Sequence, residues 1–347
     1  MMDAPARPTA NMPALRTIPF IDAPSGPVQL AELRAASLQP LLAIAKETLS
    51  ATTIRWGDRL SRRWLARSAS PYRRDVESVE RLLQVPGAYV LNLNYEWACT
   101  TGCHPRDGLA AMTLYRTLDW PLRLGAEVVV ARHETPHGPY LNVTWPGFVG
   151  LLTAVAKGRF AAAINQGPMT YSFDRFGLGL PIDWCVNRIR VWRQRALPPT
   201  HLLRQVFETC RTYAQAKERL LTTPVAAPVF FTLTGTHPGE GCIIERREND
   251  AVLHEGANVT ANHWLNDQFH GRPRPIHSLD RREKLLELMP RATETFDWLQ
   301  PPILNRLTRL ACEMNAGVGS LVAQGWDGTV PQTTILACDT DAGIRRP

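Results

Sequence analysis

The sequence predicts an α+β fold in which a helical segment precedes a larger domain rich in strands. Apolar residues recur at helical spacing through residues 28–83, whereas short β-prone runs separated by Gly and Pro follow Cys99. Helical stretches between two groups of strands favour two sheets that pack face to face under a cover of helices. We therefore expect a helical domain at residues 1–98 and a second domain at residues 99–347.

The first domain is predicted from its spacing and its helix signals. Residues 1–27 are rich in Pro and Ala and are expected to form a loosely ordered lead. Helices are predicted over Val28–Leu49 and Ile54–Leu65. A third helix is predicted to begin at Ser70-Pro71, because Ser is a good N-cap and Pro fits the first turn, and to end at Pro86-Gly87.

The second domain is predicted to alternate between strands and helices. Strands are expected at Cys99 onward, Met112–Leu118, Glu127–Arg132, Tyr140–Trp145, Phe160–Ile164, Pro228–Thr234, Gly241–Arg246, Ala251–Glu255 and Thr333–Cys338. Helices are expected at Asp174–Arg195, Pro199–Leu221, Arg281–Leu288 and Ile303–Glu313.

Composition places the chain among globular proteins. Of its 347 residues, 44% are hydrophobic and 20% charged, and no apolar run approaches the ~20 residues of a membrane span. The first 27 residues lack the apolar core of a signal peptide, so a cytoplasmic protein is expected.

The net charge of +7 comes almost entirely from arginine, because the chain has only four lysines. Basic residues concentrate at 55–74 and 188–195. No nucleic-acid-binding motif accompanies them, so no nucleic-acid partner is expected. Solvated helix faces explain these clusters most simply, and attraction to an anionic lipid surface is the alternative.

The seven cysteines do not predict a disulfide scaffold, because their number is odd and the chain is long. Five lie in mostly apolar contexts and are expected to be buried thiols: Cys185, Cys210, Cys242, Cys312 and Cys338. The Cys99-x-x-x-Cys103-His104 cluster has no second pair at zinc spacing. Neither a metal nor a cofactor is therefore expected.

The candidate catalytic nucleophile is Cys99, which is followed by two threonines and then by Arg116 and Asp119. A nucleophilic thiol needs a base, and the α-amine of Cys99 would provide one if Cys99 became an N-terminus. Spacing alone leaves other interpretations open. Cys99 fits an ordinary buried cysteine, Arg116 and Asp119 fit a surface ion pair, and Cys103 is a rival nucleophile.

Cys99-Thr-Thr followed by Arg116-x-x-Asp119 resembles the acid ceramidase and N-acylethanolamine acid amidase family. This family belongs to the N-terminal-nucleophile cysteine hydrolases, beside the choloylglycine hydrolases. Further segments share the resemblance, which extends over roughly residues 85–325: Gly235–Arg246, Ala261-Asn262, Leu279–Arg282 and Pro301–Asn305.

The resemblance implies a four-layer αββα sandwich and a chain that cuts its own Ala98–Cys99 bond. The helical segment would then become a separate subunit that stays associated with the rest. Cys99 would be the nucleophile, Asp119 would fix its free amine, and Arg116 would steady the thiolate and the carboxylate. Asn262, together with Asn165 or the backbone beside it at Gln166, would stabilise the oxyanion. Arg281 would close the site.

We therefore predict a self-processing amidase that acts on an N-acyl amide with a lipid-like acyl chain. Ceramide, N-acylethanolamine, N-acyl amino acid and acyl-homoserine lactone all remain open as substrates. Acyl transfer to an amine and a non-catalytic scaffold that never matures are the alternatives. Candidates for an acyl pocket, for each of which core packing is an equal alternative, are Trp145, Phe148, Val149, Trp184 and Trp264.

Overall fold

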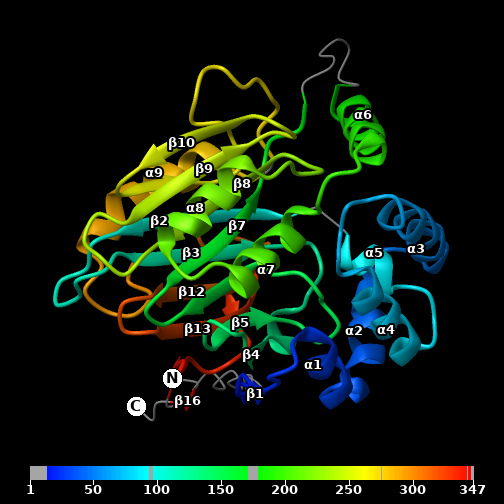
Figure 1. The fold of residues 1–347 in the computed structure, drawn as a ribbon, viewed down its shortest axis with the longest axis horizontal. Helices are drawn as coiled ribbons and strands as arrows, with labels where there is room; N and C mark the ends of the chain where they lie inside the picture. Colours follow the sequence, from blue (N-terminus) through cyan, green and yellow to red (C-terminus); the bar gives the residue numbers. More distant parts are fainter. Residues whose placement is uncertain (1–13, 94–96, 171–178, 275, 342, 345–347) are drawn as a thin grey trace, which may run out of the picture.

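The computed structural model describes residues 14–93, 97–170, 179–274, 276–341 and 343–344. Two stacked sheets form its centre, and a group of helices from the first part of the chain lies beside them (Figure 1). These helices are α1 (Pro27–Leu33), α2 (Ala35–Thr48), α3 (Ala51–Leu65), α4 (Arg73–Leu83) and α5 (Ala88–Asn92).

The first sheet has eight strands, antiparallel except where β1 meets β4. Its order is β1 (Phe20–Asp22), β4 (Val129–His133), β5 (Tyr140–Thr144), β6 (Thr153–Ala156), β7 (Phe160–Gln166), β8 (Val229–Thr234), β9 (Gly241–Arg246) and β10 (Ala251–Glu255).

The second sheet carries the predicted nucleophile on β2. Its order is β11 (Asn258–Thr260), β2 (Ala98–His104), β3 (Thr113–Asp119), β12 (Thr308–Asn315), β13 (Ser320–Asp327), β15 (Leu336–Asp339) and β16 (Gly343–Ile344), with β14 (Val330–Pro331) paired to β13.

The two sheets pack face to face, and helices cover both outer surfaces. A hydrogen bond of 2.7 Å joins the hydroxyls of Thr101 on β2 and Thr232 on β8 across the interface. Helices α7 (Pro199–Thr209) and α8 (Tyr213–Thr222) contact the first sheet, and α9 (Ser278–Leu288) contacts the second (Figure 1). The structure thus confirms the four-layer αββα sandwich.

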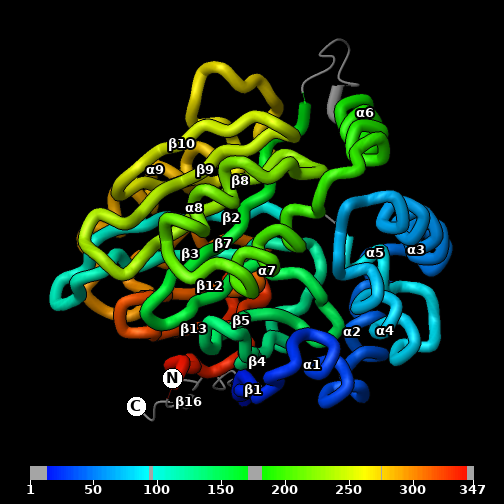
Figure 2. The backbone as a smooth tube through the Cα atoms, viewed as in Figure 1, coloured from blue at the N-terminus to red at the C-terminus, as the bar shows by residue number. Residues whose placement is uncertain are grey.

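Residues 14–27, the described part of the N-terminal segment, are more ordered than the sequence predicts. Residues 20–22 form β1 at the edge of the first sheet, whereas residues 1–13 lie outside the described residues. Arg16 donates its backbone N–H to the carbonyl of Gln332 at 3.0 Å, so segments near the two ends of the chain lie side by side (Figure 2).

The prediction of a helix over Ile303–Glu313 is wrong, because this region contains the central strand β12. Every residue of β12 is buried, so the strand lacks the alternation of a half-exposed strand. Apolar residues at 303, 304, 307, 310, 311 and 314 also fit helical spacing, which explains the error.

Other boundaries also differ from the prediction. The helix expected over 199–221 is two helices, because α7 ends at Thr209, Cys210 is extended, and Thr212 caps α8 by accepting the N–H of Gln215. The helix expected over 28–49 is likewise divided into α1 and α2. Within the helix expected over 174–195, residues 174–178 lie outside the described part, and α6 covers Gly179–Arg193. Strands β6, β11 and β13 were not predicted.

Among the residues that the structure describes, no helix has the length and apolarity needed to span a membrane.

Candidate active site

Strands β2 and β3 place the predicted site residues on the two faces of one sheet. Their register sets Cys99 opposite Leu118, Thr101 opposite Arg116, and Ala98 opposite Asp119. Side chains alternate between faces along a strand, so Cys99, Thr101 and Arg116 share the face toward the first sheet. Asp119 points to the other face, which α9 covers. The site therefore straddles the sheet at one end of β2.

Arg116 is a buried cation beside the Cys99 sulfur. Its Nη2 donates to Cys99 Sγ at 3.7 Å, and its Nη1 donates to the Ile164 carbonyl at 2.8 Å. No carboxylate among the described residues forms an ion pair with Arg116, whose side chain is fully buried. A buried, unpaired positive charge favours a negative charge nearby, which a thiolate would provide.

The Cys99 thiol is completely buried in the unbroken chain. Burial raises its pKa above the usual range, and the charge of the Asp119 carboxylate acts in the same direction, whereas a backbone hydrogen bond with Asp119 acts against it. Arg116 and, more weakly, Arg281 oppose this rise. The thiol form therefore dominates at neutral pH until the charges around it change.

Asp119 is held by neutral donors as well as by a cation. It accepts hydrogen bonds from Asn305 Nδ2 and Thr308 Oγ1, both at 2.9 Å, and pairs with Arg281 Nη1 at 3.4 Å. Burial raises the pKa of the Asp119 carboxyl, while Arg281, Asn305 and Thr308 act to lower it. These contacts fix the carboxylate directly beside the position of residue 98.

Arg281 connects the outer helix layer to the nucleophile. From α9, its Nη1 donates to the Cys99 carbonyl and to Thr100 Oγ1, both at 2.7 Å. Its Nη2 donates to Asn262 Oδ1 at 2.8 Å. Burial lowers the pKa of the Arg281 guanidinium, and Asp119 opposes that effect. One side chain thus orients the peptide carbonyl, the amide and the carboxylate of the site.

The two asparagines contact different parts of the site. Asn262 Oδ1 accepts the backbone N–H of Cys99 at 2.8 Å, while its Nδ2 donates to the carbonyl of Gln166 at 2.8 Å. Asn165 Oδ1 accepts from Arg116 Nη1 at 3.3 Å, and its Nδ2 lies 3.3 Å from the Ala261 carbonyl. All six predicted site residues therefore belong to one contact network.

Of the remaining cysteines, Cys312 lies opposite Arg116 in the pairing of β12 with β3, whereas Cys103 and Cys185 have no contact with the network among the described residues. Cys103 Sγ donates to the carbonyl of Gly256 at 3.4 Å, and burial raises its pKa to about 12. The expectation that Cys185 is buried is wrong: its position on the outward side of α6 leaves it exposed. No group of three or more His, Cys, Asp or Glu residues suited to a metal occurs within the described ranges.

An apolar cavity lies between the N-terminal helices and the sandwich. Its volume is about 60 Å³, and it is lined from α2 and α4 by Leu38, Leu41, Val79 and Leu83, and from the sandwich by Trp120, Trp145 and Phe148. Trp120 directly follows Asp119 and packs edge-to-face on Trp145 at 5.8 Å and on Trp97 at 6.4 Å. A continuous aromatic row therefore leads from residue 97 to the cavity.

The other acyl-pocket candidates do not line this cavity. Val149 is buried and donates its N–H to Asn92 Oδ1 at 2.7 Å. Trp184 is 47% exposed on α6. Trp264 packs between Phe230 and Phe269, with ring centroids 5.1 Å from each.

The sequence did not predict the residues that donate hydrogen bonds to Asp119, or the contact of the Gln166 side chain with Trp97. Asn305 lies in the Pro301–Asn305 motif, which was a usable signal. Thr308 carries no local signal, because only the pairing of β12 with β3 brings it to Asp119.

The chain is similar in sequence to acid ceramidases, which confirms the resemblance seen in its motifs. The enzyme of Heterocephalus glaber is 23% identical over 273 residues, covering 70% of this chain and 67% of the relative. The human enzyme is 22% identical over 268 residues, covering 69% and 65%. The alignments thus span about two thirds of these relatives. No protein-family model matches the chain.

Solved structures also resemble this one. The Caenorhabditis elegans ortholog of N-acylethanolamine-hydrolyzing acid amidase aligns with a TM-score of 0.48 and 17% identity, covering 63% of this chain and 93% of its own. A mutant of conjugated bile acid hydrolase from Clostridium perfringens aligns with a TM-score of 0.43 and 11% identity, covering 72% and 95%.

Thr308→Val should destabilise the protein, because it removes a hydrogen bond to the buried Asp119 carboxylate. Bonds to charged groups contribute about 1.5–3 kcal/mol, so the free energy of unfolding in urea should fall by that order. Thr117→Val is the matched control, since the buried Thr117 hydroxyl has no hydrogen-bond partner in the described part of the chain. Equal losses in both variants would contradict the role of Thr308.

Proposed function

We propose that this chain, a homologue of the acid ceramidases, is a self-processing cysteine amidohydrolase. Its substrate would be an N-acyl amide with a lipid-like acyl chain. The observation that carries the proposal is the convergence of Arg116, Asn262 and Arg281 on Cys99. The similarity of the sequence to acid ceramidases supports the same substrate class.

Maturation would begin at the Ala98–Cys99 bond. The Cys99 thiol attacks the Ala98 carbonyl carbon, the peptide C–N bond breaks, and the nitrogen leaves as the free α-amine of Cys99. Water then hydrolyses the resulting thioester and leaves a carboxyl terminus at Ala98. The new amine lies beside Asp119, because Ala98 pairs with Asp119 in the register of β2 and β3.

Turnover would use the new amine as the general base. With an unperturbed pKa near ~8, an α-amine can accept the thiol proton. The thiolate attacks the substrate carbonyl, the amine product leaves with a proton, and water hydrolyses the acyl-thioester. Asn262 and Asn165 would supply oxyanion donors after their Nδ2 groups turn from the carbonyls of Gln166 and Ala261, to which they donate in the uncut chain. The unpaired charge of Arg116 supports both the thiolate and the oxyanion.

The apolar cavity is the proposed entry of the acyl chain, and its lining would move apart to admit a long chain, because its volume in the uncut protein is about 60 Å³. Trp120 joins the reacting end to the cavity, since it follows Asp119 in the chain and packs on Trp145. The N-terminal helices contribute half of the lining, so both fragments would be needed for binding. The two fragments would stay together after cleavage through contacts such as the Tyr72 hydroxyl to Glu208 at 2.5 Å.

Self-cleavage is tested by intact-mass measurement of the purified protein. Wild type should give two fragments that divide before Cys99, and Cys99→Ala should give one chain. Cleavage of freshly made precursor should accelerate as the pH rises, because burial raises the pKa of Cys99 and only the thiolate attacks.

Cys103→Ala is the control and should cleave normally, since Cys103 lies outside the site network. A single intact chain that hydrolyses N-acyl amides at full rate would disprove self-processing. Product analysis with and without added amines distinguishes hydrolysis from acyl transfer.

Leu41→Trp should shorten the preferred acyl chain, because the larger side chain fills the apolar cavity. We expect kcat/KM for a sixteen-carbon N-acyl amide to fall roughly tenfold or more relative to a four-carbon analogue. Small changes in the size of an apolar pocket alter kcat/KM ratios by about this factor. Leu33→Trp is the control, because Leu33 on α1 is 55% exposed. An unchanged ratio of the two kcat/KM values would exclude this cavity as the acyl site.

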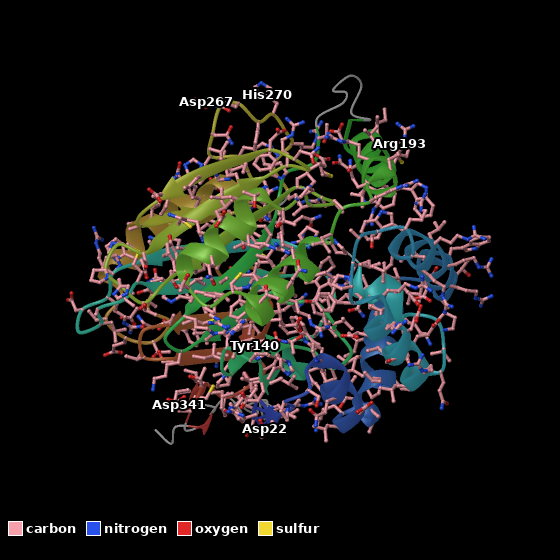
Figure 3. All side chains as sticks on the ribbon, in the orientation of Figure 1. Asp22, Tyr140, Arg193, Asp267, His270 and Asp341 are labelled. Atoms are coloured by element: carbon pink, nitrogen blue, oxygen red, sulfur yellow. The ribbon has the colours of Figure 1, made fainter. Side chains whose placement is uncertain are left out.

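Peripheral contact with an anionic lipid surface is also part of the proposal. The exposed side of α3 presents Trp56 and Leu60, which are 57% and 45% exposed, among Arg55, Arg59 and Arg63. No carboxylate of the described residues pairs with these three arginines. Nitrogen-tipped side chains project outward from this side of α3 and from α6, where Arg193 is labelled (Figure 3). Basic residues with exposed Trp and Leu are typical of interfacial helices.

Reversing two of these charges, in Arg55→Glu/Arg59→Glu, should weaken flotation with phosphatidylserine vesicles. Each basic residue contributes about 1 kcal/mol near an anionic surface, so binding should fall at least tenfold and be sensitive to salt. Arg291→Glu/Arg306→Glu is the charge-matched control on another exposed region. Equal losses of vesicle binding in the two double variants would show that binding depends on net charge alone and not on the exposed side of α3.

A further inference from the structure

The side chain of Gln166 contacts the segment that precedes the proposed cleavage point. Its Oε1 accepts the backbone N–H of Trp97 at 2.9 Å, and Gln166 is only 6% exposed at the end of β7. Trp97 lies two residues before Cys99. The hydrogen bond therefore joins the helical segment of the chain to the sandwich immediately beside the Ala98–Cys99 bond.

Three hydrogen bonds hold the chain around that bond. Gln166 holds the N–H of Trp97, Asn262 Oδ1 holds the N–H of Cys99 at 2.8 Å, and Arg281 holds the Cys99 carbonyl at 2.7 Å. Asn262 also donates to the backbone carbonyl of Gln166 at 2.8 Å, so its amide and the Gln166 backbone form one unit. The peptide to be attacked is thus restrained on both sides.

Only one of these restraints acts on the segment that cleavage would separate from Cys99. Asn262 and Arg281 contact Cys99, which remains in the site after cleavage. Gln166 Oε1 contacts Trp97, which belongs to the other fragment once the Ala98–Cys99 bond is broken. The hydrogen bond therefore restrains the segment before the cleavage point, and not a residue of the fragment that begins at Cys99.

From this geometry we infer that the side chain of Gln166 is a positioning group for self-cleavage that acts on the precursor segment. Its amide oxygen fixes Trp97, and thereby the Ala98 carbonyl, in reach of the Cys99 sulfur. Reactions between groups on one chain depend steeply on such alignment, and small misplacements cost up to ~10²-fold in rate. The inference rests on the proposed function, because it assigns a residue to the maturation step.

The test separates maturation from turnover in Gln166→Leu, which keeps most of the side-chain volume but has no acceptor. Precursor made in a short cell-free translation pulse is followed over time by gel electrophoresis and intact mass. We expect cleavage to slow roughly 10- to 100-fold. After long incubation, kcat/KM for an N-acyl amide, expressed per cleaved chain, should fall by a much smaller factor than the cleavage rate does.

Two further variants distinguish positioning from a general loss of structure. Gln166→Glu retains an acceptor oxygen and should cleave much faster than Gln166→Leu. Gln324→Leu removes another buried glutamine side chain, which donates to the carbonyl of Thr333 at 3.0 Å far from Cys99, and should cleave at the wild-type rate.

The outcomes separate this inference from the proposed function. If wild type cleaves and Gln166→Leu cleaves equally fast, the inference fails while self-processing stands. Equal slowing of Gln166→Glu and Gln166→Leu would also overturn it, because the acceptor would then be irrelevant. If wild type itself is never cut, the proposed maturation fails first.

Discussion

The buried guanidinium of Arg281 is the interaction on which the arrangement around Cys99 depends. A buried cation must be surrounded by acceptors, because removing its water is costly. Here the acceptors are the Ile276 carbonyl just before α9, together with the Cys99 carbonyl, Thr100, Asn262 and Asp119, which come from three other parts of the chain. Satisfying this single charge therefore brings β2, β3 and the segment after β11 to one point beneath α9.

The site divides its charges between the two faces of one sheet. Arg116 lies on the inner face beside the sulfur, whereas Asp119 and Arg281 lie toward the outer helix layer, close to the backbone of residue 99. Such separation lets one cation act on the thiol while a carboxylate and a second cation act on the main chain. In the proposed chemistry, the first group would serve the nucleophile and the second would serve the newly formed amine.

Local patterns predicted those parts of the molecule whose properties reside in short stretches. The spacing of Cys99, Arg116 and Asp119 spans two neighbouring antiparallel strands, so their proximity follows from one strand pairing. Strands with clear β-prone runs, such as β5 and β7, lie where they were expected. In contrast, β12 was misassigned, because a strand buried on both faces has no alternating pattern.

By itself, the sequence determined which chemical groups are present and that strands follow from Cys99 and from Met112, while the role of Cys99 with Arg116 and Asp119 came from the family resemblance. Only the tertiary structure decided that Thr308 and Asn305 hold Asp119, and that Gln166 reaches the N–H of Trp97. The sequence separations of these contacts run from 69 to 189 residues. Whether such residues meet depends on strand register and layer packing, and a shift of one residue would turn each side chain to the opposite face.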